Sequence, residues 1–283
     1  MIFDFYNQFG ALNSKPVFQN FENGLKKHGH TIEYHSGTGD VAVIWSVLWF
    51  GRMRNNQQVF DSYRKKGKPV IVLEIGNLIR DTSPNGDDPR ATWKIGINGI
   101  NLPNYFVSNK DQERFKKLGL SFAPWKNTGE HILLCSQHER SEQWRTMPPS
   151  DVWVNQTIEQ IREHTDRPIR IRSHPRFPLR RPFKQQNSIL SHVPFMADLN
   201  TAWAVVNHCS NPGIEAVING VPAFVSQISL AAPVANTDYS MIETPLRPDR
   251  TQWGNDLAWT EWTQQEMLDG IPQDLIFQKL KTY

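Results

Sequence analysis

Apolar runs of strand length alternate with amphipathic segments along the first 76 residues. The runs predict strands at residues 2–6, 31–35, 41–45 and 69–76. Apolar residues at helical spacing predict a helix that begins at Pro16 and closes at Gly29, and a polar segment predicts a second helix at residues 55–66. This β-α-β-β-α-β order indicates a parallel sheet with helices on both faces.

The same alternation restarts after residue 130. Strands are predicted at residues 131–137, 169–175, 202–208 and 222–226, and helices at residues 151–164, 212–219 and 259–270. Between the halves, residues 81–103 are rich in Asn, Gly, Asp and Pro and predict long loops. A short helix is predicted at residues 110–118, and residues 119–130 form the predicted linker.

These patterns predict an α/β protein with two Rossmann-like parallel-sheet domains that face a central cleft. The predicted domains are residues 1–125 and 126–255, and the C-terminal helix in residues 256–283 is expected to pack across their junction. In open α/β sheets, ligands bind beyond the carboxyl ends of the strands. Some of the 10 Trp and 15 Phe residues either line such a cleft or fill the core.

Length and composition narrow the class of protein. A chain of 283 residues suits two domains, and its net charge of +3 permits a polyanionic partner without requiring one. No apolar run approaches the roughly 20 residues of a membrane span, and no secretory signal is evident. Cys135 and Cys209 lie in apolar segments without C-x-x-C spacing. We expect a cytoplasmic monomer or weak dimer that does not contact a membrane.

A strand, a turn and a helix follow one another at residues 207–225. Backbone N–H groups at the helix start, together with the Ser210 hydroxyl, can bind a phosphate group. Glu215 lies close enough to the helix start to reach a ribose hydroxyl. The alternative is structural, because Ser210 or Asn211 can cap the helix and Glu215 can interact with its dipole.

His174 follows a predicted strand and lies between Arg172 and Arg176, which suits binding of a diphosphate. The two cations favour a neutral imidazole that donates a hydrogen bond or positions the ligand. Alternatively, His174 is a strand-end residue held by a backbone carbonyl. Ser136 and Gln137 end the first strand of the second half.

The order strand, S-x-x-G-x-E-A, helix, G-x-P, strand resembles the donor-binding segment of GT-B glycosyltransferases. The stretch R-S-H-P-R-F resembles the His-Pro motif of capsule-polysaccharide and sialyltransferase-like members. The resemblance covers about residues 132–226 and extends to the N-terminal half only in pattern. It implies a GT-B-like fold and a nucleotide-sugar donor, expected to be UDP-linked. The expected donor contacts are Ser136, Gln137, Arg172, His174, Arg176, Ser210, Asn211, Gly213 and Glu215.

No D-x-D motif occurs in the chain, and the pair Asp87–Asp88 lies in a Pro/Gly loop. GT-A enzymes hold a metal ion on the diphosphate with a D-x-D motif, whereas GT-B enzymes usually use helix dipoles and basic side chains. We therefore expect a metal-independent transferase that needs no cofactor beyond its donor.

A general base for the acceptor hydroxyl is expected in the N-terminal half. The candidate catalytic residues are Glu74, Asp40 and Asp81. Glu74 stands near the end of a predicted strand, and Gly76 after it allows a substrate to approach the backbone. Each of the three carboxylates can instead cap a loop or form a salt bridge.

Basic residues interleaved with aromatic ones suit a phosphate backbone with a stacked or flipped base. Eight basic residues lie between positions 162 and 184, and others cluster at residues 64–68. They can equally form a solvated surface with some diphosphate contacts. The expected acceptor or DNA contacts are Asn13, Ser14, Lys15, Arg52, Arg54, Arg180 and Arg181.

Four segments resemble small glycosyltransferases of tailed bacteriophages: ALNSKPVF, VLEIGN, WKIGINGIN and LAWTEWTQQEM. Phages use such enzymes to attach sugars to hydroxymethylated pyrimidines in their own DNA. The resemblance implies 5-hydroxymethylcytosine or 5-hydroxymethyluracil in double-stranded DNA as the acceptor. A surface polysaccharide or other glycan is the alternative acceptor. A non-catalytic nucleotide-binding or nucleic-acid-binding protein on a GT-B scaffold is the alternative from another class.

Overall fold

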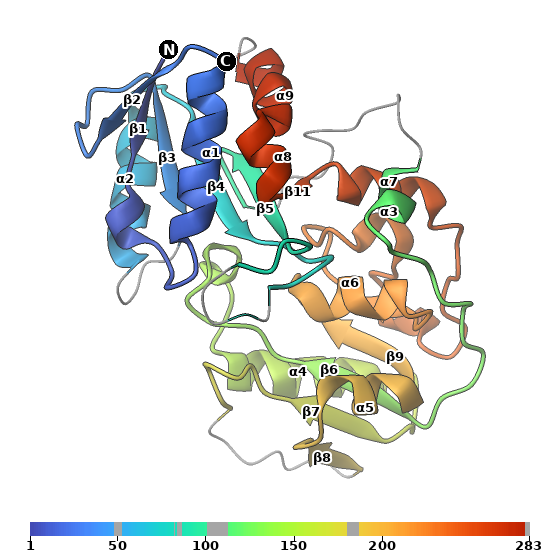
Figure 1. Ribbon diagram of the computed structural model, residues 1–283. Coiled ribbons are helices and arrows are strands. Elements are labelled where there is room, and N and C mark those ends of the chain that lie inside the picture. Colours follow the sequence, from blue (N-terminus) through green and yellow to red (C-terminus); the bar gives the residue numbers. More distant parts are fainter. Residues whose placement is uncertain (48–52, 82, 84–86, 101–112, 180–186, 281–283) are drawn as a thin grey trace. The chain divides into compact units, whose positions relative to one another are not determined.

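The computed structural model describes residues 1–283 except for 48–52, 82, 84–86, 101–112, 180–186 and 281–283. The chain divides into two units (Figure 1). Unit 1 comprises residues 1–118 and 254–283, and unit 2 comprises residues 119–253. Each unit has its own sheet with helices, which confirms the predicted α/β class with two Rossmann-like halves.

Unit 1 contains a six-stranded sheet in the order β11-β5-β4-β3-β1-β2. Its strands are β1 (Ile2–Phe5), β2 (Thr31–Tyr34), β3 (Val41–Trp45), β4 (Val70–Ile75), β5 (Thr92–Ile97) and β11 (Glu261–Thr263). Strands β1 to β4 are parallel, whereas β5 and β11 run antiparallel to their neighbours. The helices are α1 (Lys15–Lys27), α2 (Arg54–Lys65), α3 (Arg114–Lys117), α8 (Gln264–Asp269) and α9 (Ile271–Leu280). The helix α7 (Thr251–Ala258) begins in unit 2 and ends in unit 1.

Both faces of the unit 1 sheet are covered, which explains the continuous apolar pattern of β3. Val43 and Trp45 pack in one core with α1, α8 and α9, and Ile44 packs on the opposite side with Tyr63 of α2. Figure 1 shows the C-terminal helices α8 and α9 beside α1 at the start of the chain. Residues 254–280 are therefore part of the N-terminal fold.

Two strands of unit 1 differ from the prediction. β5 lies within the segment predicted as loops, and β11 lies within the predicted helix at residues 259–270. In β5, Trp93, Ile95 and Ile97 alternate with more polar residues and enter the core. β11 has only three residues and is defined by its pairing with β5. The helix starts after it, where Thr263 and Glu266 form a capping box.

Unit 2 contains a five-stranded, fully parallel sheet in the order β10-β9-β6-β7-β8. Its strands are β6 (His131–Cys135), β7 (Ile169–Arg172), β8 (Ser188–Leu190), β9 (Ala202–Asn207) and β10 (Ala223–Phe224). The helices are α4 (Ser150–Arg162), α5 (Phe195–Thr201) and α6 (Asn211–Ile218). The predicted strands near residues 131, 169, 202 and 222 are confirmed, whereas β8 and α5 were not predicted.

The strand order of unit 2 reverses between β6 and β9. β7 and β8 extend the sheet on one side of β6, and β9 and β10 extend it on the other. This is the order of a Rossmann half, in which ligands bind at the carboxyl ends of the strands at the reversal point. Within the described ranges, no helix is both long and apolar enough to cross a membrane.

Candidate functional site

The loops that carry the predicted donor contacts start side by side at the carboxyl edge of the unit 2 sheet. Cys135, the last residue of β6, lies in register with Arg172 of β7 and with Asn207 of β9. The residues after these three strand ends include Ser136, His174 and Ser210. The fold therefore brings the predicted motifs together at the reversal point of the sheet, although up to 74 positions of the chain separate them.

Ser136 and Gln137 connect these loops through their side chains. The Ser136 hydroxyl oxygen accepts a hydrogen bond from the His174 backbone N–H at 2.9 Å. The Gln137 Oε1 atom accepts one from the Cys209 backbone N–H at 3.2 Å, and its Nε2 atom donates to Ser141 at 3.1 Å. Both residues are almost fully buried. The predicted nucleotide contacts thus have a geometric role, because they hold the β7 and β9 loops against the β6 loop.

His174 has a defined tautomer in its neutral form. Its Nδ1 atom accepts a hydrogen bond from the Arg176 backbone N–H at 3.2 Å, so the ring proton is on Nε2. A second histidine, His138, lies next to it with a ring-centroid distance of 5.1 Å. His138 is not among the residues that the sequence motifs indicate, although its position directly after the Ser-Gln pair at a strand end is an available signal.

The side chain at the start of α6 makes no capping hydrogen bond to the helix backbone. Ser210 is the N-cap residue in an extended conformation, and its hydroxyl accepts a hydrogen bond from Asn207 Nδ2 at 3.1 Å. Glu215 accepts a hydrogen bond from Asn211 Nδ2, so its carboxylate is tied to the first residue of the helix. Gly213 faces the sheet, where an added Cβ would lie 2.7 Å from Asn207 Oδ1. The glycine of the S-x-x-G motif therefore permits close packing of the helix on β9.

Several buried polar atoms at this edge have no hydrogen-bond partner within the described part of the chain. They come from the ends of β9 and β10 and from the first turn of α6. These atoms are Asn207 Oδ1, His208 Nε2, Asn211 Oδ1 and Ser226 Oγ. Because buried polar atoms are nearly always hydrogen-bonded in folded proteins, a ligand or a water molecule is expected to bond these four atoms.

Arg172 is directed toward α5. Its guanidinium group bonds Asp198 at 3.2 Å and the Val193 carbonyl at 2.5 Å. Arg170 also pairs with Asp198, which is completely buried. The structure thus uses Arg172 to neutralise a buried carboxylate. Arg176 is exposed beside His174, and Arg180 and Arg181 lie outside the described residues.

The three candidate bases of unit 1 lie at different places on its sheet. Glu74 is near the carboxyl end of β4, where it accepts a hydrogen bond from the Ile75 backbone N–H at 2.8 Å. Asp81 follows in the next loop and accepts one from Ser83 at 2.7 Å, while its Oδ2 atom is buried without a partner in the described structure. Asp40 precedes β3 at the opposite edge and accepts one from the Ile2 N–H. Glu74 and Asp81 therefore lie toward the ligand-binding edge, whereas Asp40 does not.

The predicted acceptor contacts of unit 1 are only partly exposed. Lys15 and Arg54 are exposed at the first positions of α1 and α2, which follow the carboxyl ends of β1 and β3. Asn13 is half-buried, and Ser14 is buried with its hydroxyl donating to the Ala11 carbonyl at 2.8 Å. Arg52 lies outside the described residues.

Two buried carboxylates of unit 1 have structural partners. Asp4 accepts four hydrogen bonds, which come from Tyr6 Oη, Tyr63 Oη, Ser36 N and Gly37 N. Burial opposes ionisation of Asp4, but these hydrogen bonds outweigh it and lower the pKa of the carboxyl group. Glu261 accepts hydrogen bonds from Asn77 N at 2.7 Å, Leu78 N at 3.1 Å and Thr92 Oγ1 at 2.7 Å. Both carboxylates stabilise the fold.

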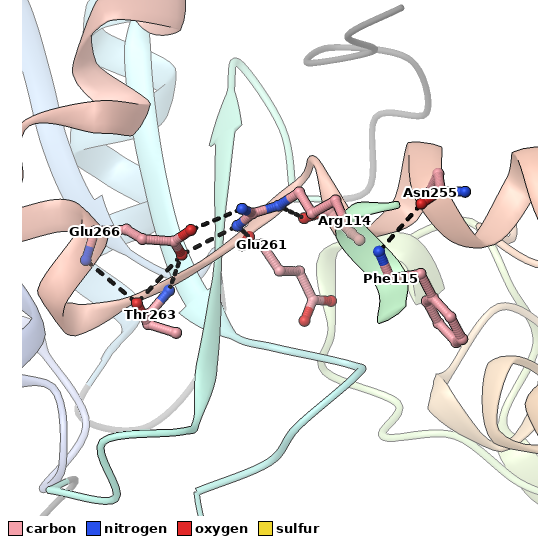
Figure 2. Close-up of polar contacts among 7 residues, drawn as sticks. Arg114, Phe115, Asn255, Glu261, Thr263 and Glu266 are labelled. Carbon is pink, nitrogen blue, oxygen red and sulfur yellow. Dashed lines mark hydrogen bonds and ion pairs between the residues drawn. The ribbon is translucent and has the colours of Figure 1, made fainter. Parts of the chain in front are cut away.

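Glu261 is also connected to Arg114 through its backbone carbonyl, and Figure 2 shows Arg114 together with Thr263 and Glu266. The Arg114 guanidinium donates to Glu266 at 2.7 and 3.0 Å and to the Glu261 carbonyl at 2.8 Å. Trp259 and Trp262 stack on the same guanidinium. This network explains the Trp-rich C-terminal segment, whose role the sequence pattern did not reveal.

Comparison with known proteins yields a likeness in structure only. No family model matches the sequence, and no curated protein matches it. KpsC of Thermosulfurimonas dismutans, described as a beta Kdo 2,4 transferase, has a TM-score of 0.56 at 13% identity over 97% of both chains. The KpsC beta Kdo 2,7 transferase of the same organism has a TM-score of 0.47 at 11% identity, with 96% of this chain and 99% of that chain covered. The likeness to the first of these structures shows a GT-B glycosyltransferase fold, as the sequence resemblance implied.

Proposed function

We propose that this protein transfers a sugar from a nucleotide-sugar to a hydroxyl acceptor. The observation that carries the proposal is the carboxyl edge of unit 2, where hydrogen bonds join the Ser136, His174 and Cys209 loops beside the start of α6. The GT-B fold over nearly the whole chain supports the same conclusion. In this proposal the nucleotide-sugar binds at that edge, with Ser210, His174 and Glu215 as its main contacts.

The chemistry follows from the groups at the edge. During transfer the bond between the sugar carbon and the phosphate oxygen breaks as the bond to the acceptor oxygen forms. Negative charge then develops on the leaving phosphate, where the α6 N-terminus and the Nε2–H of His174 stabilise it. Glu215 accepts a hydrogen bond from a sugar hydroxyl of the donor. These groups supply the stabilisation that a metal ion provides in other transferases, so we propose transfer without a metal.

The acceptor hydroxyl needs a base that takes its proton as the new bond forms. Glu74 is the proposed base, because it stands at the ligand-binding end of β4 in the N-terminal unit. Asp81 is the second candidate, since one of its carboxylate oxygens has no partner among the described residues. Asp40 is the weakest, because it lies at the opposite edge and binds the Ile2 N–H.

A saccharide hydroxyl is one acceptor class that the observations favour. The similar structure with the higher TM-score is described as a Kdo transferase. Much of the basic stretch in unit 2 is also engaged within the protein, since Arg162 bonds backbone carbonyls, Arg167 pairs with Glu243, and Arg170 pairs with Asp198. These arginines have less capacity to bind a DNA backbone.

A 5-hydroxymethylpyrimidine in double-stranded DNA is the second acceptor class. The exposed cations Lys15 and Arg54 favour it, because they begin the helices that follow β1 and β3 at the ligand-binding edge of unit 1. The resemblance to phage enzymes supports the same acceptor. A non-catalytic nucleotide-binding protein is the alternative outside the enzyme class.

One experiment distinguishes these possibilities. The protein is incubated with a panel of nucleotide-sugars and either 5-hydroxymethylcytosine DNA or a set of oligosaccharides, and the products are measured by mass spectrometry. A hexose or pentose mass shift on one acceptor identifies donor and acceptor together. Donor hydrolysis without transfer supports the enzyme and excludes the tested acceptors. Donor binding without hydrolysis or transfer supports the binding protein, and no binding of any donor contradicts the proposal.

A further inference from the structure

We propose that His138 is a second phosphate-binding residue of the donor site and acts with His174 as a pair of neutral imidazole donors. This inference rests on the proposed function and adds a residue that the resemblance does not assign. It also adds a third residue of the loop after β6 to the proposed donor contacts Ser136 and Gln137.

The two histidines lie in the loops that follow two neighbouring strands. His138 is the third residue after β6, and His174 is the second residue after β7. These strands pair in register up to Cys135 and Arg172, and Ser136 then bonds the His174 backbone. The rings consequently meet at a centroid distance of 5.1 Å with an interplanar angle of 78°.

Both rings are held in the same tautomer by the same local turn. His138 Nδ1 accepts a hydrogen bond from the Arg140 backbone N–H at 3.1 Å, and His174 Nδ1 accepts one from Arg176 at 3.2 Å. In each neutral ring the proton is therefore on Nε2, which becomes a hydrogen-bond donor. Two such donors suit a ligand with several acceptor oxygens, such as a phosphate group.

The charges around His138 favour an anionic ligand. Burial lowers the pKa of His138, and the nearby Arg176 and Arg140 lower it further, which favours the neutral ring. The carboxylate of Glu139, next to His138 in the chain, accepts a hydrogen bond from the Ser150 backbone N–H. The Arg140 guanidinium lies 5.8 Å from the centre of the Phe177 ring, and that ring also contacts His138. An anion at this place therefore gains from two imidazole donors and two guanidinium groups.

Paired substitutions test the position of the donor nitrogen. In His138→Gln the side-chain amide places an N–H near the former Nε2 position, whereas His138→Asn retains a polar group only near Nδ1. Titration calorimetry with UDP and with inorganic pyrophosphate is measured at pH 7.5. We expect His138→Asn to raise the Kd at least tenfold and His138→Gln to raise it less. His192→Gln, at an exposed histidine of the same unit, is the control and leaves the Kd unchanged.

Nitrogen chemical shifts of the histidine rings provide a second readout. The proposal expects Nε2–H tautomers for His138 and His174 in the free protein, and shifts of both Nε2 signals when pyrophosphate is added. Binding by the wild type with an unchanged His138 signal and an unchanged Kd for His138→Asn overturns this inference and leaves the donor site intact. Equal losses of affinity in His138→Asn and His138→Gln indicate a structural role of His138 and also overturn this inference. No binding of UDP or pyrophosphate by the wild type overturns the donor site itself.

Discussion

The carboxylate of Glu261 accepts a hydrogen bond from the Asn77 backbone N–H at 2.7 Å, although 184 positions separate the two residues. Asn77 belongs to the loop that follows β4, the strand that carries Glu74. Gly76 permits this approach, because an added Cβ would lie 2.6 Å from Glu261 Oε2 and 2.1 Å from the Thr92 carbonyl. The C-terminal segment thus determines the conformation of a loop beside the proposed catalytic base.

Glu261→Ala is expected to release the loop after β4. It leaves the N–H groups of Asn77 and Leu78 and the hydroxyl of Thr92 without their acceptor, which costs about 3 kcal/mol of unfolding free energy. Urea unfolding measures the loss, and hydrogen exchange locates it at the Asn77 and Leu78 amides. Glu163→Ala, at an exposed position, is the control. Unchanged exchange at the two amides would contradict this role of Glu261.

Arg114→Lys is expected to destabilise unit 1. A lysine cannot reproduce the two hydrogen bonds to Glu266 together with the bonds to the Ala258 and Glu261 carbonyls. It also stacks less well on Trp259 and Trp262. We expect a loss of roughly 2–4 kcal/mol in urea unfolding, because the pair is largely buried. A loss below about 0.5 kcal/mol would show that the network contributes little.

Gly213→Ala is expected to weaken both stability and donor binding. The new Cβ would lie 2.7 Å from Asn207 Oδ1 and 2.9 Å from Val225 Cγ1, so the first turn of α6 must shift. Overpacking of this kind costs about 1–3 kcal/mol. The double variant Gly213→Ala/Val225→Ala removes one of the two contacts and should recover part of the loss. A thermodynamic cycle of the four proteins measures that coupling, and strictly additive losses would contradict the packing argument.

His131 is expected to make stability depend on pH. Burial is the main cause that lowers the pKa of His131 to about 4, and Arg170 adds to it. Between pH 6.5 and 4 the unfolded chain binds a proton that the folded protein does not, so stability falls as the pH falls, by roughly 3 kcal/mol at most.

Replacing His131 with phenylalanine removes this titration. In urea unfolding at a series of pH values, His131→Phe should lose less stability than the wild type between pH 6.5 and 4. The substitution also removes two buried ring nitrogens that have no partner in the described structure. The same substitution at the exposed His192, written His192→Phe, serves as the matched control. Parallel pH profiles for wild type and His131→Phe would rule out the proposed linkage.

Glu74→Gln tests the proposed base. If Glu74 takes the acceptor proton, the variant should lower kcat by about 10²- to 10⁴-fold while the KM for the donor changes little. Asp40→Asn is the comparison, because Asp40 lies at the opposite edge of the sheet, and it should retain activity. A normal kcat for Glu74→Gln, with a large loss for Asp81→Asn, would assign the base to Asp81.

The local hydrophobic pattern was sufficient to predict the strands and helices whose buried residues follow a regular spacing. The sequence predicts β3 as a strand because its five residues form a continuous apolar run, buried on both faces of the sheet. It predicts α1 as a helix because Phe18, Phe21 and Leu25 recur on one buried side. β5 was missed because it lies in a segment rich in Asn, Gly and Pro, and β11 was missed because it has three residues. Both are strands only through pairing with distant partners.

The amino-acid sequence alone predicted two α/β halves and the strand-turn-helix at Ser210. Both predictions rest on local signals, which are alternating apolar runs and a Ser-Asn-Pro-Gly turn. Tertiary structure decided how the candidate residues are used. Gln137 bonds Cys209, Arg172 bonds Asp198, and His138 meets His174, through contacts between residues 26 to 72 positions apart. Hydrogen bonds and ion pairs depend on which strands become neighbours, and only the folded sheet determines that.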